Sequence, residues 1–229
     1  MSDSHNVIIA CDFPSAETCL KFLNNFDSER PWVKIGMELY YAEGPNIVRQ
    51  LKERGHPVFL DLKLHDIPNT VKKSMRVLAE LGADMVNLHA AGTRAMMEAA
   101  REGLGGRAKL LAVTMLTSTD QQRMEREIMI SAPLEDVVLH YAKNAAEAGL
   151  DGVVCSPLEA GKVHEVCGKS FLTVTPGVRF ADSAVGDQIR VTTPSVAKKL
   201  GSDYIVVGRP ITQAADPYEA WLRCVNDFC

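Results

Sequence analysis

The sequence lacks what membrane, secreted and nucleic-acid-binding proteins usually carry. No segment of the 229 residues approaches the roughly 20 consecutive apolar residues that a membrane-spanning helix needs. The first residues show no basic stretch followed by an apolar core, so we expect no secretion signal. Positive charge is not in excess, since 25 lysines and arginines stand against 29 aspartates and glutamates. We therefore expect neither a membrane nor a nucleic acid as a partner.

Motifs of several common enzyme classes are missing as well. The six cysteines show no CxxC or CxxH spacing, which fits a reducing, cytoplasmic compartment without structural disulfides. The sequence contains neither an HExxH motif nor a carboxylate–histidine cluster, so it predicts no metal site. The absence of GxSxG, Walker and GxGxxG motifs removes the usual signatures of hydrolases, kinases and dinucleotide-binding proteins.

What the sequence does contain is a regular alternation of two patterns. Short, β-branched apolar runs recur, and each is followed by a turn and then by a stretch with helical periodicity. The expected strands are 7–12, 33–36, 58–63, 85–90, 109–116, 152–155, 171–176 and 204–208. The expected helices are 15–25, 44–54, 69–81, 93–103, 134–148, 157–166, 194–200 and 217–228.

Eight such units favour one architecture. Continuously apolar strands joined by helices are typical of a parallel sheet buried on both faces. We therefore predict an α/β protein with one domain over residues 1–229, a closed (β/α)₈ (TIM) barrel; strand number alone leaves a doubly wound sheet open. An AGxD or LGxD pattern repeats before three strands. Two longer loops, 117–133 and 177–193, are expected at the carboxyl end of the barrel, where active sites and lids are built.

The strongest local pattern is DLKLHDIPNT at 61–70, where the third strand ends. Residues two apart on a strand share a face, so Asp61 and Lys63 should both point into the barrel mouth, while the leucines between them pack outward. Asp66 follows in the loop. Buried charges must pair, and an alternating Asp–Lys–Asp set pairs while it keeps the lysine protonated. The triplet indicates a catalytic centre; the alternative is an ion-pair network that only closes the strand end.

Neighbouring strand ends add further charge. Asp12 ends the first strand, and Lys34 lies in the second strand with its side chain opposite the helix-facing valine and isoleucine. Either residue alone could be a solvated rim group. Together with Asp61 and Lys63 they predict four converging charges on adjacent strands.

The far end of the chain predicts a phosphate site. Gly208 and Arg209 directly follow the eighth strand, and Arg179 and Gln188 lie in the loop after the seventh. Loops after strands seven and eight commonly bind phosphate in this fold, because glycine lets backbone N–H groups approach and arginine offers a forked donor. The alternative is a simple turn with a solvated arginine.

At these motifs the sequence resembles the orotidine 5′-phosphate decarboxylase family, in its bacterial branch. The resemblance covers nearly the whole chain. It is carried by ACD at 10–12, VKIG at 33–36, DLKLHDIPNT at 61–70, VNLHA at 86–90, VTMLTS at 113–118, DGVVCSP at 151–157, TPGVR at 175–179, DQIRVTTP at 187–194 and VGRPI at 207–211. The resemblance implies decarboxylation of orotidine 5′-phosphate to UMP without a metal or an organic cofactor.

The same resemblance implies a role for each site residue. Lys63 would be the proton donor, assisted by Asp61 and Lys34, and by Asp66 reaching into the partner subunit's site of a homodimer. The substrate-binding residues would be Asp12 and the neighbouring chain's Thr70 at the ribose, Thr117 or Ser118 near the pyrimidine, and Arg179, Gln188, Gly208 and Arg209 around the phosphate.

Two other functions stay open at this point. Sugar-phosphate decarboxylases and aldolases resemble this family and share a DxKxxD strand, but they use Mg²⁺, so metal dependence separates them. The continuation 67–70 and the Asp187–Gln188 loop favour the nucleotide substrate. The third possibility is a nucleotide-binding barrel without activity, against which the intact triplet argues, since a binding module has little need to bury it.

Overall fold

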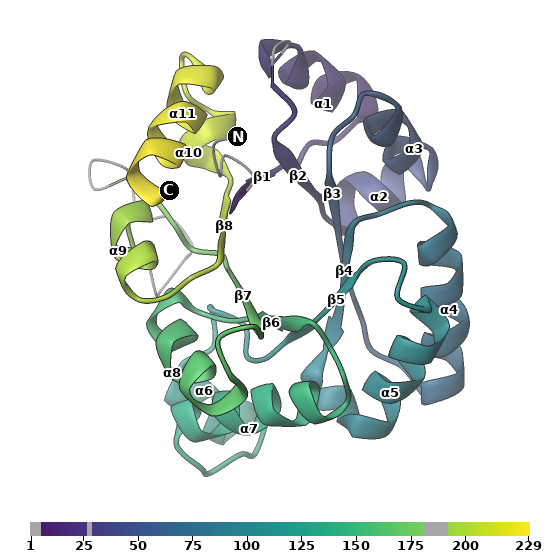
Figure 1. Ribbon diagram of the computed structural model, residues 1–229, viewed down its shortest axis with the longest axis vertical. Coiled ribbons are helices and arrows are strands. Elements are labelled where there is room, and N and C mark those ends of the chain that lie inside the picture. The colour runs from purple at the N-terminus through teal and green to yellow at the C-terminus, as the bar shows by residue number, and fades with distance from the viewer. Residues whose placement is uncertain (1–5, 27–28, 181–191) are drawn as a thin grey trace.

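Eight parallel strands close into a barrel in the computed structural model, which describes residues 6–26, 29–180 and 192–229. Each strand pairs with the next along the chain, and the last pairs with the first, so the described part of the sheet has no free edge (Figure 1). The strands are β1 (Val7–Ala10), β2 (Trp32–Ile35), β3 (Val58–Leu64), β4 (Met85–His89), β5 (Lys109–Val113), β6 (Gly152–Val154), β7 (Leu172–Thr175) and β8 (Tyr204–Val207). The predicted (β/α)₈ barrel is confirmed.

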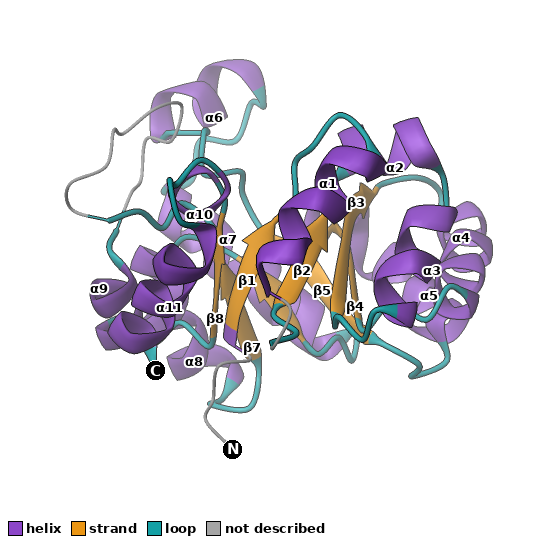
Figure 2. Cartoon of the chain, turned by 90° about the horizontal axis from the view of Figure 1, so that it is seen from above, coloured by secondary structure: helices purple, strands orange, loops and turns teal. Residues whose placement is uncertain are grey.

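Helices form a ring around this barrel (Figures 1 and 2). They are α1 (Ala16–Leu23), α2 (Met37–Glu43), α3 (Asn46–Glu53), α4 (Pro68–Glu80), α5 (Thr93–Leu104), α6 (Gln121–Glu127), α7 (Leu134–Glu147), α8 (Pro157–Cys167), α9 (Pro194–Lys199), α10 (Arg209–Thr212) and α11 (Pro217–Phe228), with 3₁₀ turns η2 (Asn24–Phe26) and η3 (Ala90–Gly92). Among the described residues, no helix is both long and apolar enough to cross a lipid bilayer.

Three of these helices, α2, α6 and α10, were not predicted from the sequence, and α6 contradicts one prediction. The segment 117–133 is not a loop throughout, because α6 lies within it. Its N-cap is Asp120, whose side chain accepts a hydrogen bond from the backbone N–H of Arg123 at 2.8 Å. Figure 2 shows α6 on the side to which the strand arrows point. Six strands are also shorter than predicted, most of all β5, which ends at Val113, and β1, which ends at Ala10.

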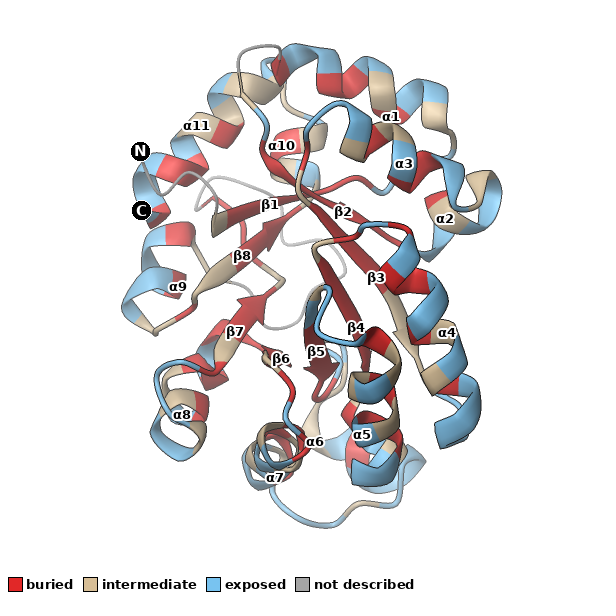
Figure 3. Ribbon diagram, turned by 45° about the vertical axis from the view of Figure 1, so that its right-hand side comes forward, coloured by how far each residue is buried: buried red, intermediate tan, exposed pale blue. Residues whose placement is uncertain are grey.

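Strand alternation divides the core into two layers. Side chains such as Val33 and Ile35 face the helices and belong to the large apolar layer between helices and sheet. Trp32, Phe59 and Met85 instead point into the barrel and form a smaller apolar cluster there. Most strand residues are buried, with intermediate burial at some strand ends, such as the carboxyl end of β3 (Figure 3). Each inward apolar residue of β2, β3 and β4 is followed two positions later by a polar one, so the barrel interior becomes polar toward its carboxyl end.

The AGxD and LGxD repeats have a common structural reason. Each aspartate carboxylate accepts a backbone N–H from the start of the previous strand and pairs with a basic side chain from a preceding helix. The donors are Val58 and Lys52 for Asp84 (2.7 and 2.6 Å), Leu110 and Arg101 for Asp151 (2.7 and 2.8 Å), and Thr173 and His164 for Asp203 (2.8 and 3.0 Å). These contacts lie at the amino end of the barrel, where residues usually serve stability.

Candidate active site

Four charged side chains form a continuous chain of ion pairs at the carboxyl end of the first three strands. Lys34 Nζ lies 2.9 Å from Asp12 Oδ1 and 3.4 Å from Asp61 Oδ2. Lys63 Nζ lies 2.6 Å from Asp61 Oδ1. The predicted convergence of four charges is therefore present, in the order Asp12, Lys34, Asp61, Lys63. Because the charges alternate, each inner group has an opposite charge on both sides.

The order of the strands explains why these residues meet. Lys34 is opposite Ala10 in the β1–β2 ladder and opposite Phe59 in the β2–β3 ladder. Asp12 and Asp61 each lie two residues beyond those partners, on the same inward face. Gly36 leaves the room they need, because a Cβ there would lie 2.9 Å from Asp12 Oδ1 and 3.2 Å from Lys34 Nζ.

Burial makes this array electrostatically strong. The side chains of Lys34 and Asp61 are both 11 % exposed, whereas that of Asp12 is 58 % exposed. Burial alone would lower the pKa of Lys34, but Asp61 and Asp12 outweigh it and raise that pKa above its usual value. Burial likewise would raise the pKa of Asp61, but Lys34 and Lys63 outweigh it and lower that pKa. The fold therefore holds both groups in their charged forms.

Lys63 stands on an irregular stretch of β3. Its backbone φ is 51°, a left-handed conformation that is uncommon for a lysine. The β3–β4 ladder is interrupted at this point, because the four steps from Leu60 to Leu64 lie against only two steps of β4, from Val86 to Leu88. Such bulges re-aim side chains next to active sites.

Asn87 is a site residue that our sequence reasoning missed. The residue is 1 % exposed inside the barrel, and its side-chain amide contacts both Asp61 and the backbone of Lys63. The available signal was positional: Asn87 is the one amide within β4, two residues after the inward-facing Met85. Its contact with Lys63 lies where β3 bulges, and the sequence pattern does not predict that bulge.

Two adjoining cavities extend from the charged array. One, of about 190 Å³, is lined by Asp61, Lys63 and Thr117 together with apolar side chains of β5, β6 and β8. The other, of about 440 Å³, is lined by Asp12, predicted to contact the ribose, and by the predicted phosphate residues Arg179, Gly208 and Arg209. Lys34, Pro176 and Val206 line both cavities, so the two form one cleft with a compact inner end and a basic outer end.

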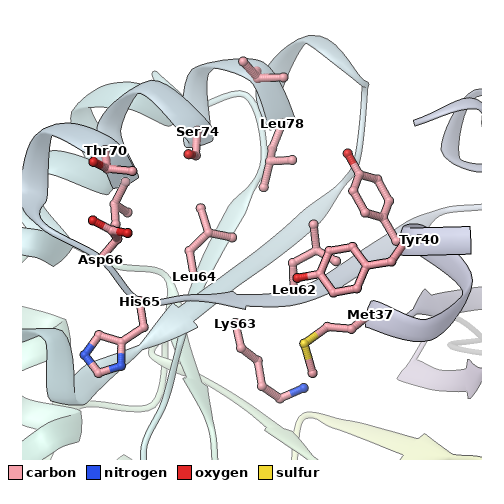
Figure 4. Close-up of a pocket in the computed structure, with 13 residues that line it drawn as sticks. Met37, Tyr40, Leu62, Lys63, Leu64, His65, Asp66, Thr70, Ser74 and Leu78 are labelled. Atoms are coloured by element: carbon pink, nitrogen blue, oxygen red, sulfur yellow. The ribbon is translucent and has the colours of Figure 1, made fainter. Parts of the chain in front are cut away.

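Three other predicted residues lie elsewhere. Ser118 is exposed and lines neither of these two cavities; its backbone carbonyl accepts from the Arg123 guanidinium at 2.7 Å. Asp66 and Thr70 are exposed and line a separate groove of about 580 Å³ beside β3 and α4, which Lys63 also lines. In Figure 4 the Lys63 side chain extends away from both of them. Gln188 lies outside the described residues.

The histidines near the site are neighbours of the array. The rings of His65 and His89 lie 5.7 Å apart. Burial, together with the nearby His65 and Lys63, lowers the pKa of His89, so that its neutral form is favoured. Within the described ranges, no group of three or more His, Cys, Asp or Glu residues is arranged to hold a metal ion.

The closed barrel with this charged cleft at its carboxyl end places the chain among the (β/α)₈-barrel enzymes. A family model described as "Orotidine 5′-phosphate decarboxylase / HUMPS family" matches residues 5–224, so the chain belongs to this family. The resemblance of its motifs is thereby confirmed.

Individual relatives agree with the family model. An orotidine 5′-phosphate decarboxylase from Bacillus caldolyticus is 58 % identical over 228 residues, covering 96 % of this chain and 93 % of the relative. One from Streptococcus pneumoniae (strain ATCC 700669 / Spain 23F-1) is 58 % identical over 218 residues, covering 95 % and 94 %. The crystal structure of orotidine 5′-phosphate decarboxylase from Lactobacillus acidophilus has a TM-score of 0.88 at 42 % identity, covering 98 % and 99 %.

Proposed function

We propose that this chain is a carboxy-lyase that converts orotidine 5′-phosphate to UMP, the last step of UMP synthesis. The observation that carries the proposal is the buried Asp12–Lys34–Asp61–Lys63 array at the inner end of the cleft. The relatives from Bacillus caldolyticus and Streptococcus pneumoniae, both 58 % identical over nearly the full chain, support the same reaction.

The chemistry of this reaction suits the array. Loss of CO₂ breaks the bond between C6 and the carboxylate carbon and leaves the electron pair on C6, where no carbonyl group is placed to delocalise it. In our proposal the Lys63 ammonium stabilises this carbanion and then transfers a proton from Nζ to C6; solvent returns a proton to the amine. Asp61, which is itself held by Lys34, keeps that ammonium in place before the reaction begins, so little reorganisation is needed.

The outer end of the cleft would bind the rest of the nucleotide. We assign Asp12 to the ribose, Thr117 or Ser118 to the vicinity of the pyrimidine, and Arg179, Gln188, Gly208 and Arg209 to the phosphate. Support comes from the cavity itself, which Arg179, Gly208 and Arg209 line together. A phosphate bound far from C6 contributes to catalysis when its binding energy is used to position the reacting carbon.

We also propose a homodimer with shared active sites, in which Asp66 and Thr70 complete the partner's cleft. Both residues are exposed beside the groove on β3 and α4, away from the Lys63 amine of their own chain. The same groove exposes Met37 and Val77, which are 44 % and 57 % exposed, and a partner would cover them.

Mixed dimers test this arrangement. Lys63→Ala and Asp66→Ala homodimers should each be nearly inactive. After the two are unfolded and refolded together, about a quarter of wild-type activity should return, because half the molecules are heterodimers with one complete site of two. Full activity of Asp66→Ala alone, or no recovery on mixing, would refute shared sites.

We extend the proposal to the whole chain as one barrel domain over residues 1–229. We also propose a reducing, cytoplasmic location, since the six cysteines show no CxxC or CxxH spacing and four of them are buried. Its partners would be orotidine 5′-phosphate and UMP, with no nucleic acid or membrane, and it would need no cofactor.

The most direct assay follows the fall in ultraviolet absorbance of orotidine 5′-phosphate with purified protein in excess chelator. We expect full turnover. A Mg²⁺ requirement would instead favour the second candidate, a sugar-phosphate decarboxylase or aldolase. The description of the matched family names a second group, HUMPS, beside orotidine 5′-phosphate decarboxylase, so this alternative needs the test. Tight binding of UMP without any turnover would identify a nucleotide-binding barrel that lacks activity.

A further inference from the structure

Asn87 joins the two sides of the reaction centre through one buried amide. Its Oδ1 accepts a hydrogen bond from the backbone N–H of Lys63 at 2.8 Å. Its Nδ2 donates to Asp61 Oδ1 at 2.7 Å, the same oxygen that receives the Lys63 ammonium at 2.6 Å. A single side chain from β4 therefore contacts the residue that carries the ammonium and the carboxylate that holds it.

The backbone contact falls where β3 departs from regular geometry. Between Leu60 and Leu64 the ladder to β4 is broken, and Lys63 adopts its left-handed φ of 51°. A non-glycine residue in that region costs roughly 1 to 2 kcal/mol and persists only when its surroundings hold it there. The amide oxygen of Asn87 accepts from the Lys63 N–H and thus helps to hold the bulged conformation.

We propose that Asn87 is a positioning residue that fixes the Lys63 backbone and the Asp61 carboxylate relative to each other, so that the Lys63 ammonium is aimed into the cleft. The inference rests on the proposed decarboxylase function. Asn87 itself lines neither cavity of the cleft, so it acts through Lys63 and Asp61.

Only a side chain with an acceptor and a donor on one planar group performs both tasks. Alanine offers neither. A carboxylate can accept from the Lys63 N–H, but it cannot donate to Asp61, and it places a second negative charge beside that carboxylate. A protonated carboxylic acid has the shape of the amide and supplies both an acceptor and an O–H donor.

These differences define the experiment, with Asn87→Ala and Asn87→Asp as variants. For Asn87→Ala we expect kcat to fall on the order of 100-fold, the size of effect that a displacement of about 1 Å produces, with UMP affinity within about threefold of wild type. For Asn87→Asp we expect the ratio of its kcat to that of wild type to rise as the pH falls from 8 to 5, because the protonated acid restores the donor.

Two controls separate positioning from stability and from other titrating groups. Thr173→Val removes a buried hydroxyl that bonds to Gly201 and Asp203 at the opposite end of the barrel, so it should lower the melting temperature and leave kcat unchanged. The histidines near this site are His89, two residues after Asn87 on β4, and His65, whose ring lies 5.7 Å from that of His89. Asn87→Ala keeps both histidines, so its kcat ratio to wild type should stay flat between pH 8 and 5.

The outcomes are distinguishable. If Asn87→Ala loses stability like Thr173→Val but keeps its kcat within about threefold, Asn87 is only structural and the proposal fails. If Asn87→Ala does not fold, the isosteric Asn87→Asp tests the proposal instead. A ratio of its kcat to that of wild type that does not change with pH overturns the proposal. If wild type itself does not decarboxylate orotidine 5′-phosphate, the proposed function fails first, whatever the Asn87 variants do.

Discussion

Lys34 is the centre of the charged array, and replacing it with methionine tests whether the array is held by electrostatics. Methionine keeps most of the length of the side chain and its packing but removes the ammonium. In wild type that ammonium lies between Asp12 and Asp61 at 2.9 and 3.4 Å. Its loss leaves the Asp61 carboxylate, 11 % exposed, with Lys63 as its remaining cation in the array.

The expected magnitude follows from this burial. Removing one partner of a fully buried ion pair costs about 3 to 5 kcal/mol. Because Asp61 keeps Lys63 and the amide of Asn87 as partners, we expect Lys34→Met to lower the free energy of unfolding by about 2 to 3 kcal/mol at pH 7. The matched control is Lys162→Met, whose pair with Glu135 is 49 % and 51 % exposed. That variant should lose less than about 1 kcal/mol.

The loss should also depend on pH. The pKa of Asp61 is lowered in the folded state, so its ionised form contributes stability above about pH 4 that is lost as the pH falls through the folded value. The pKa of Lys34 is raised, so its charge contributes stability below about pH 10.4 that is lost as the pH rises through the folded value. The difference between wild type and Lys34→Met should therefore be largest near neutral pH and narrow at both extremes.

Urea unfolding followed by circular dichroism from pH 3 to pH 8 measures this difference. A loss at pH 7 no larger than that of Lys162→Met would refute the electrostatic reasoning. So would a loss that is the same at pH 3 as at pH 7, because it would then arise from packing alone.

Two further predictions concern the room around the array and the repeats at the other end of the barrel. Gly36→Ala places a Cβ 2.9 Å from Asp12 Oδ1, while the backbone φ of −87° suits alanine, so the variant should displace Asp12 with little loss of stability. We expect kcat/KM to fall about tenfold or more in steady-state assays, and an unchanged kcat/KM would contradict this. Asp151→Ala removes the carboxylate that accepts from the Leu110 N–H and pairs with Arg101. The variant should lower the free energy of unfolding by about 2 kcal/mol and leave kcat unchanged. A loss of kcat without destabilisation would show that the amino and carboxyl ends of the barrel are not independent.

The barrel was predictable because its determinants are local. The run 58–64 is apolar on the face that meets the helices, and its inward positions change from Phe59 to Asp61, which is visible in the sequence alone. The polar segment 117–133 was harder, because α6 within it is set by its Asp120 cap and by packing of Met124 against α7 more than by a long apolar stripe.

The site was predictable to the extent that it follows strand parity. Parity placed Asp61 and Lys34 correctly inside the barrel, where they meet. It could not reveal Asn87, since that contact arises only when β3 bulges and turns the Lys63 N–H toward β4. Nor could it show that Asp66 faces away from the Lys63 amine, which depends on how the chain turns after β3.

The central claim is that Lys63 supplies the proton to C6, and single-turnover decarboxylation by Lys63→Ala tests it most directly. The variant should remain folded and bind UMP, because Asp61 keeps Lys34 as a partner and the outer end of the cleft is untouched. We predict that it converts no detectable orotidine 5′-phosphate at a concentration where wild type finishes the reaction. Appreciable residual decarboxylation by the folded variant would contradict the account.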